Sequence, residues 1–143
     1  MIILFFLTAC GEKTFYSVDF QEENGSWAFA DSKEVQFSIE DTTRAYDLVL
    51  DLEHGIEYKY QNIYFKVNTQ FPDKTSQDQI LPVDLADRFG TWYGKCTSKT
   101  CSVRIFLQQK TYFNQIGDYQ ISFEQYSRED PLEYVHALGF KIF

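Results

Sequence analysis

The sequence has little positive charge, and this shortage argues against the simplest ways of binding nucleic acid or acidic lipid. Its 143 residues include 13 lysine or arginine residues against 21 aspartate or glutamate residues, for a formal net charge of −8 at pH 7. Proteins that neutralise DNA or RNA phosphates, or that dock on anionic lipid by charge, need a basic face. We therefore expect no nucleic-acid partner.

Histidine is also scarce, because His54 and His136 are the only two. Neither lies in a metal-binding, redox or nucleophile motif of the HExxH, CxxC or GxSxG kind. Asp51 and Glu53 precede His54 and are potential metal ligands, but strand alternation places both carboxylates on the solvent-facing side. We expect no metal site, no cofactor and no enzymatic activity.

A membrane-spanning run is lacking at the N-terminus, where the apolar stretch Ile2–Leu7 falls far short of the ~20 residues that a spanning helix needs. It leads into Leu7-Thr8-Ala9-Cys10, which resembles the lipobox of bacterial lipoproteins. The pattern predicts a signal peptide over residues 1–9 and a lipid on the Cys10 sulfur, although no lysine or arginine precedes the run. Residues 10–26 are then the lipidated N-terminus and tether, within which Thr14–Phe20 can add a strand to a sheet edge.

The chain contains three cysteines, an odd count that leaves one pair once Cys10 is assigned to the lipid. Cys96 and Cys101, together with the two histidines, have the residue types of a four-ligand zinc site. In an exported protein a disulfide is favoured over a zinc site. We therefore predict a disulfide between Cys96 and Cys101, with Thr97–Thr100 at the tip of a hairpin.

Many stretches of the chain alternate apolar and polar residues, and no stretch shows sustained helical periodicity with a cap at each end. The runs 46–53 and 63–71 are joined by a short glycine-containing link, which predicts two long neighbouring antiparallel strands. About seven to nine short strands separated by turns predict an all-β fold, an antiparallel β-sandwich of jelly-roll type over residues 27–143. The expected strands are 35–40, 46–53, 63–71, 79–85, 103–107, 119–123 and 135–143.

Several short segments stand in a fixed order along the chain, and the ordered set is more specific than any one of them. The segments are Cys10, Asn24-Gly25-Ser26-Trp27, Val35-Gln36-Phe37, Tyr46 to Leu52, Tyr58-Lys59-Tyr60-Gln61-Asn62-Ile63, Gly90-Thr91-Trp92-Tyr93-Gly94, Gly117-Asp118-Tyr119-Gln120-Ile121, Leu132, and Leu138-Gly139-Phe140-Lys141-Ile142. This ordered set resembles the gliding-motility lipoprotein GldH family of Bacteroidetes over essentially the whole mature chain. The chain departs from the family pattern at Glu53-His54, at Lys59 and in the loop with Cys96 and Cys101.

This resemblance implies a cell-envelope lipoprotein that the gliding apparatus requires and that works with type IX secretion. It implies no catalytic residue, and among the matched positions only Cys10 has a defined chemical role. The implied partners are the membrane, through the N-terminal lipid, and other gliding or secretion proteins of the envelope. Gly11-Glu12-Lys13 lacks the acidic cluster that in this group accompanies export to the outer surface, so we expect a protein that faces the periplasm.

Four aromatic residues in loop-like stretches, Tyr58, Tyr60, Trp92 and Tyr93, are candidates for contact with a partner. Large rings in loops supply contact area at a low entropic cost. Alternatively, they cap the ends of the sandwich. We predict a non-enzymatic protein-binding or scaffold module, with a surface carbohydrate-binding lipoprotein as the alternative, since exposed coplanar rings would serve a sugar.

Replacing Cys10 with alanine is expected to move the protein out of the membrane fraction, because the acyl chains contribute ~0.8 kcal/mol for each buried methylene. Mass spectrometry of the wild-type protein should find acyl groups on residue 10 and no residue before it. Retention of Cys10→Ala protein in the membrane pellet, with no acyl mass on the wild type, contradicts the lipobox interpretation.

Overall fold

A computed structural model describes residues 14–143, which form eleven β-strands and no helix, and therefore contain no helix able to cross a bilayer. The predicted signal peptide and its lipid site Cys10 lie outside the described residues. The strands are β1 (Tyr16–Gln21), β2 (Ser26–Trp27), β3 (Lys33–Ile39), β4 (Tyr46–Gly55), β5 (Asn62–Gln70), β6 (Ser76–Asp84), β7 (Lys95–Cys96), β8 (Thr100–Thr111), β9 (Gly117–Gln125), β10 (Leu132–Glu133) and β11 (Val135–Ile142).

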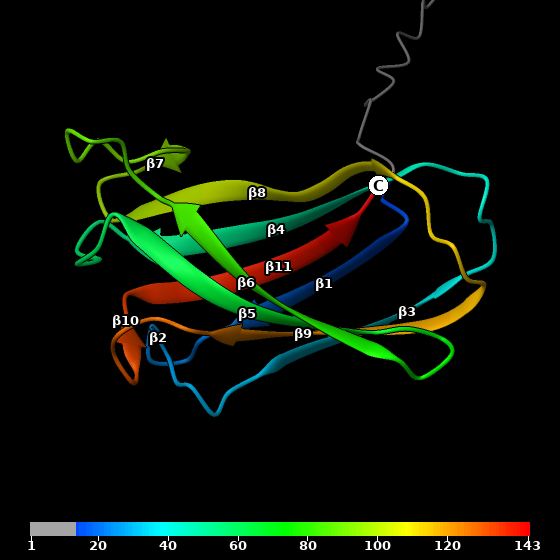
Figure 1. Ribbon diagram of the computed structural model, residues 1–143. Coiled ribbons are helices and arrows are strands. Elements are labelled where there is room, and N and C mark those ends of the chain that lie inside the picture. Colours follow the sequence, from blue (N-terminus) through cyan, green and yellow to red (C-terminus); the bar gives the residue numbers. More distant parts are fainter. Residues whose placement is uncertain (1–13) are drawn as a thin grey trace, which may run out of the picture.

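Two sheets pack face to face (Figure 1). The first sheet has the order β1-β11-β4-β8-β7, the second sheet has the order β3-β9-β5-β6, and β10 and β2 form a separate small pair. All neighbouring strands are antiparallel. Among the long strands the chain crosses to the opposite sheet at every step except β5 to β6. This confirms the predicted antiparallel sandwich of jelly-roll type.

The prediction that runs 46–53 and 63–71 are paired neighbours is wrong. They are β4 and β5, and β4 belongs to the first sheet while β5 belongs to the second. Alternation shows which side chains of a strand face the core, but both inner faces of a sandwich look at the same core. The residues between the two strands cross the end of the sandwich, where they bridge a sheet separation of ~10 Å instead of making a hairpin turn.

The core is one layer of apolar side chains between the two inner faces. Phe140 of β11 lies near its centre, with ring centroids 6.0 Å from Phe37 of β3 and 5.7 Å from Phe123 of β9. These contacts join the first sheet to the second. The largest fully buried side chains are Trp27, Phe65, Phe123, Phe140, Ile39, Leu50, Leu52, Ile63, Leu85, Leu132, Leu138 and Ile142.

The first sheet begins inside the segment that the sequence assigned to the tether. β1 pairs with β11 along its whole length and forms the edge of the first sheet, from Tyr16 opposite Ile142 to Gln21 opposite Ala137. The expectation that Thr14–Phe20 adds an edge strand is confirmed. In the sequence, the first strand therefore begins six residues after the predicted lipid site.

The predicted disulfide is present at a hairpin tip. Cys96 of β7 lies opposite Cys101 of β8, their sulfur atoms are 2.09 Å apart, and the Thr97 N–H donates to the Thr100 carbonyl oxygen at 2.7 Å. Gly94 precedes this hairpin with φ +85°, and a Cβ there would collide with the Ser102 carbonyl oxygen. Only glycine lets the chain approach β8 so closely.

Phe123→Ala is expected to lower the free energy of unfolding by ~3–5 kcal/mol, because it leaves a cavity between the two sheets. Phe89→Ala removes the same side chain from an exposed position and is expected to change stability by no more than ~0.5 kcal/mol. Urea unfolding followed by tryptophan fluorescence measures both. Similar losses in the two variants would contradict the assignment of the core.

Candidate binding groove

A groove of about 360 Å³ opens between the two sheets on the side where β6 and β8 lie. Pockets that bind small ligands span ~300–1,000 Å³. β6 is the outer strand of the second sheet. In the first sheet β7 pairs only with Cys101 and Ser102, so β8 is the outer strand of the described residues from Val103 onward. The groove is therefore bordered by two strand edges.

The floor of the groove is apolar and comes from both sheets. Leu48 and Leu107 belong to the first sheet, whereas Val67, Leu81 and Ile121 belong to the second. These side chains continue the sandwich core to its open side, so an occupant of the groove would cover apolar surface that water now reaches.

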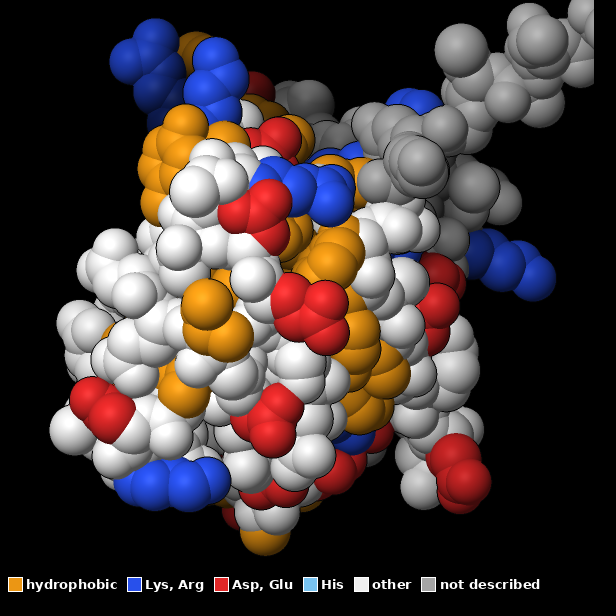
Figure 2. Space-filling model, turned by 90° about the vertical axis from the view of Figure 1, so that its right-hand side faces the viewer, with side chains coloured by type: hydrophobic (Ala, Val, Ile, Leu, Met, Phe, Trp, Pro, Cys, Tyr) orange, Lys and Arg blue, Asp and Glu red, His pale blue; other side chains and the backbone are white. Residues whose placement is uncertain are grey.

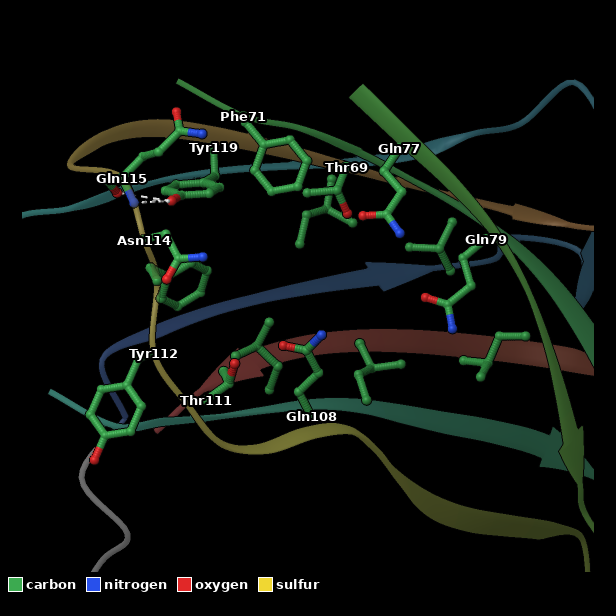
Figure 3. Close-up of a pocket in the computed structure, with 16 residues that line it drawn as sticks. Thr69, Phe71, Gln77, Gln79, Gln108, Thr111, Tyr112, Asn114, Gln115 and Tyr119 are labelled. Carbon is green, nitrogen blue, oxygen red and sulfur yellow. Dashed lines mark hydrogen bonds between the residues drawn. The ribbon is translucent and has the colours of Figure 1, made fainter. Parts of the chain in front are cut away.

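The wall formed by β5 and β6 changes from apolar to polar along the inner row. Gln79 lies opposite Val67 and Gln77 lies opposite Thr69, toward the turn that joins the two strands. Because a primary amide is costly to bury without partners, the glutamines keep the sandwich open at this point. Both point from the second sheet toward the first (Figure 3).

The opposite wall is shaped by irregularities in β8. Ile105 pairs with Leu50 and Phe106 with Val49, but Leu48 pairs with Gln108, so β8 carries one extra residue at this point. A β-bulge re-aims the side chains that follow it. Gln108 therefore joins the inner face beside Leu48 and points toward the two glutamines of β6 (Figure 3).

An aromatic cluster closes one end of the groove. The Tyr119 ring stacks on Phe37 at 5.6 Å, and the rings of Phe113 and Phe71 meet it edge-on at 4.9 Å and 6.0 Å. The Tyr119 hydroxyl donates to the Gln115 carbonyl oxygen at 2.8 Å, and burial raises the pKa of this phenol. The phenol therefore stays protonated at neutral pH and fixes the loop after β8.

The lining of the groove carries no charge among the described residues. It has no carboxylate, imidazole, amine or guanidinium group, and hydroxyl, carboxamide and apolar side chains make up the whole of it. Gln77, Gln79, Gln108 and Asn114 make no hydrogen bond through their side chains to any described residue. Each offers a donor and an acceptor. The arrangement suits a neutral occupant with polar groups above an apolar surface.

Figure 2 views the sandwich from the end that carries the loop after β8 and the turn between β5 and β6. White and orange surface covers much of this end, and acidic and basic side chains are scattered over it without forming one strongly charged face. The uncharged lining of the groove thus continues onto a surface of mixed character.

A second depression lies on the outer face of the first sheet, and its lining includes the ion pair of Asp51 and Arg104. The Arg104 Nε donates to Asp51 at 2.9 Å, and the Lys141 ammonium lies 3.1 Å from the same carboxylate. Burial opposes ionisation of Asp51, but the hydrogen bonds and charges of these two cations outweigh it and lower its pKa. Asp51 is therefore a partnered surface group, as the strand alternation predicts.

The structure brings together three of the four aromatic residues predicted as partner contacts. The Tyr58 ring lies 5.8 Å from Tyr60 and 6.4 Å from Trp92, and the Trp92 ring lies 4.7 Å from His54. Tyr58 is only 4% exposed, and its hydroxyl donates to the Asn62 carbonyl oxygen at 2.8 Å. As a surface contact the assignment of Tyr58 is therefore wrong, because its ring caps the core.

Tyr60 and Trp92 are half-buried in this cap, whereas Tyr93 is 48% exposed. A partner contact through Tyr60, Trp92 and Tyr93 stays a prediction. Only Tyr93 offers a large exposed ring, so these residues do not form a flat aromatic platform.

His54 is buried inside the cap. Its Nδ1 lies 2.9 Å from the Gly55 carbonyl oxygen, and its Nε2 has no hydrogen-bond partner. Burial lowers the pKa of His54, and the charge of His136 adds to this, against the hydrogen bond to Gly55. In residues 14–143 no three histidine, cysteine, aspartate or glutamate side chains lie together as metal ligands. Cys96 and Cys101 are engaged in the disulfide instead of a zinc site.

Sequence reasoning missed the groove, although one signal for it was present. Gln79 occupies the inner row of its strand together with Leu81 and Val83, where an apolar residue is expected. A polar side chain in a core-facing row indicates an opening in the core. No comparable signal existed for Gln108, because the bulge changes its face.

Two comparisons relate this chain to known proteins. The sequence profile of a family described as "GldH lipoprotein" matches residues 15–142. A protein of Christiangramia forsetii named "Gliding motility lipoprotein GldH homolog" is 27% identical over 150 residues, covering 99% of this chain and 89% of that protein. No solved structure gives a significant match. The predicted family resemblance is confirmed.

The burial of His54 predicts that acid destabilises the protein in a defined pH range. The pKa of His54 in the folded chain lies below its ordinary value of 6.5, so the unfolded chain binds more protons as the pH falls through 6.5. The melting temperature should therefore be lower at about pH 5.5 than at about pH 7.5, with a limiting slope of ~1.4 kcal/mol per pH unit. Differential scanning calorimetry of His54→Phe should show this dependence lost, whereas His136→Gln should keep it. An unchanged dependence in His54→Phe would contradict the assignment.

Proposed function

The chain belongs to the GldH lipoprotein family, and on this basis we propose that it is a lipid-anchored, non-enzymatic component of the gliding-motility machinery. It acts as a protein-binding or scaffold module in the cell envelope, on the periplasmic side, and works with the type IX secretion system. Its contact site for a partner is the groove between β6 and β8.

The chemistry of the groove lining is the observation that carries this proposal. General acid–base catalysis and nucleophilic catalysis depend on an imidazole, carboxylate, amine or thiol that is positioned against the substrate. The groove instead presents carboxamides, hydroxyls and apolar side chains. The hydroxyls of Thr69 and Thr111 have no base beside them in that lining. This composition supports binding without turnover.

Carbohydrate binding is the second candidate, because carboxamide side chains also pair with sugar hydroxyls. The arrangement of the rings favours it less. Tyr119 stacks on Phe37 and meets Phe113 and Phe71 edge-on, so its ring is occupied by the core. Tyr112 belongs to the lining and is exposed, but its ring is turned away from Gln77, Gln79 and Gln108 (Figure 3). A protein partner therefore fits the groove better than a stacked sugar.

Filling the groove is expected to stop gliding without unfolding the protein. Gln79→Trp puts a large ring into the groove from an exposed position, whereas Ile80→Trp puts the same ring on the outer face of the same strand. Cells that carry Gln79→Trp as their only copy should lose spreading and single-cell movement, with normal protein abundance and melting temperature. Cells that carry Ile80→Trp should glide normally.

Secretion of a reporter that depends on type IX secretion, measured in the same strains, tests the link between the two systems. Normal gliding in Gln79→Trp cells would contradict a role for the groove. Normal secretion in cells that have lost gliding would separate the protein from type IX secretion.

A further inference from the structure

We propose that the groove receives an extended, uncharged peptide segment of a partner protein, which adds as a strand to the free edge of β8. This inference rests on the proposed function, because it identifies the kind of partner segment that the groove binds. It is carried by the edge of β8, by the side chains on both sides of that edge and by the uncharged lining.

Among the described residues, no strand covers the outer edge of β8 from Ile105 onward. From Ile105 to Thr111 the strand pairs with β4 on one side, and no strand of the described residues pairs with it on the other. No other backbone hydrogen bond joins this stretch to the rest of residues 14–143. An edge of this kind presents a row of backbone donors and acceptors that fits one ligand best, namely another strand.

The free edge of β8 is less protected than that of β6. β6 carries Asp78, Pro82 and Asp84, and charges and proline are the usual devices that prevent pairing at an edge. Between Ile105 and Gln109 the β8 sequence has neither a charge nor a proline. This stretch would pair with a segment of about five residues, since paired strands rise by the same ~3.3 Å per residue.

Side chains on both faces of the edge match an added strand. Phe106 projects from the outer face of β8 and is 55% exposed, whereas Val49, which lies opposite it on β4, is buried. A strand beside β8 would bring alternate side chains against Phe106. Its other side chains would enter the groove over Leu48, Leu107 and Val67.

The glutamines determine the charge and polarity of the segment. Gln77 and Gln79 reach from the second sheet toward Gln108 (Figure 3), and their amides can pair with peptide groups or with serine, threonine and glutamine side chains. A charged side chain in the groove would find no counter-charge in the described lining and would lose its hydration. The segment is therefore neutral where it enters the groove.

Binding can be tested with the mature chain in its unacylated form, Cys10→Ser. A displayed library of nine-residue peptides supplies the probes, with Val, Ile, Leu or Phe at alternate positions and Ser, Thr, Asn or Gln between them. Selected peptides are synthesised with a fluorophore and titrated by fluorescence anisotropy. We expect Gln79→Trp to weaken binding by about tenfold or more and Ile80→Trp to leave it unchanged.

Backbone methylation separates strand addition from simple filling of the groove. N-methyl groups on the alternate amides that face β8 are expected to weaken binding by about tenfold, since each removes an edge hydrogen bond. N-methyl groups in the other register should have a smaller effect. Hydrogen–deuterium exchange should show slowed exchange of backbone amides in residues 105–109 when the peptide is bound.

Three outcomes would overturn the inference. One is a library that yields no peptide sensitive to Gln79→Trp, and another is binding of neutral cello-, manno- or xylo-hexaose in the groove where no peptide binds. The third is reversible dimerisation of the chain in analytical ultracentrifugation that Gln79→Trp abolishes, which would make a second copy the occupant.

If peptides fail to bind but Gln79→Trp cells still lose gliding, the proposed function stands without this inference. If peptides bind but those cells glide, the peptide site stands and the proposed function fails.

Discussion

The contacts of Phe140 with Phe37 and Phe123 hold the two sheets together, and the rest of the structure depends on them. Their ring centroids lie 6.0 Å and 5.7 Å apart across the middle of the sandwich. Burial of large aromatic side chains is a major source of stability in a fold of this size. Because these central contacts hold the sheets together, the side chains at the rim of the sandwich decide whether the space between the sheets is filled or left open there.

One end closes. The rings of Tyr58 and Trp92 pack around the buried His54. The hairpin that carries the disulfide between Cys96 and Cys101 lies beside His54, because Cys101 of β8 is the register partner of His54 in β4. These residues include two of the positions where the chain departs from the family pattern. They stabilise the cap through packing and a covalent link.

The side between β6 and β8 stays open, for a reason that is again local. Gln77, Gln79 and Gln108 occupy inner positions that would otherwise be filled by apolar side chains, and amides without partners are not buried. The result is an apolar floor under polar walls, next to a strand edge that no other strand of residues 14–143 covers. This construction suits the protein-binding role that we propose for this lipoprotein.

The sequence by itself determined the strands, the jelly-roll class, the disulfide and the family. Alternation with a period of two reveals which side chains face the core, and the spacing of Cys96 and Cys101 suits opposite positions on a hairpin. The sequence did not determine that β4 and β5 lie in different sheets, because the inner faces of both sheets meet the same core. Only the tertiary structure buried Tyr58 and built the groove. Gln79 and Gln108 line the groove from opposite sheets, and a bulge in β8, which alternation does not show, turns Gln108 inward.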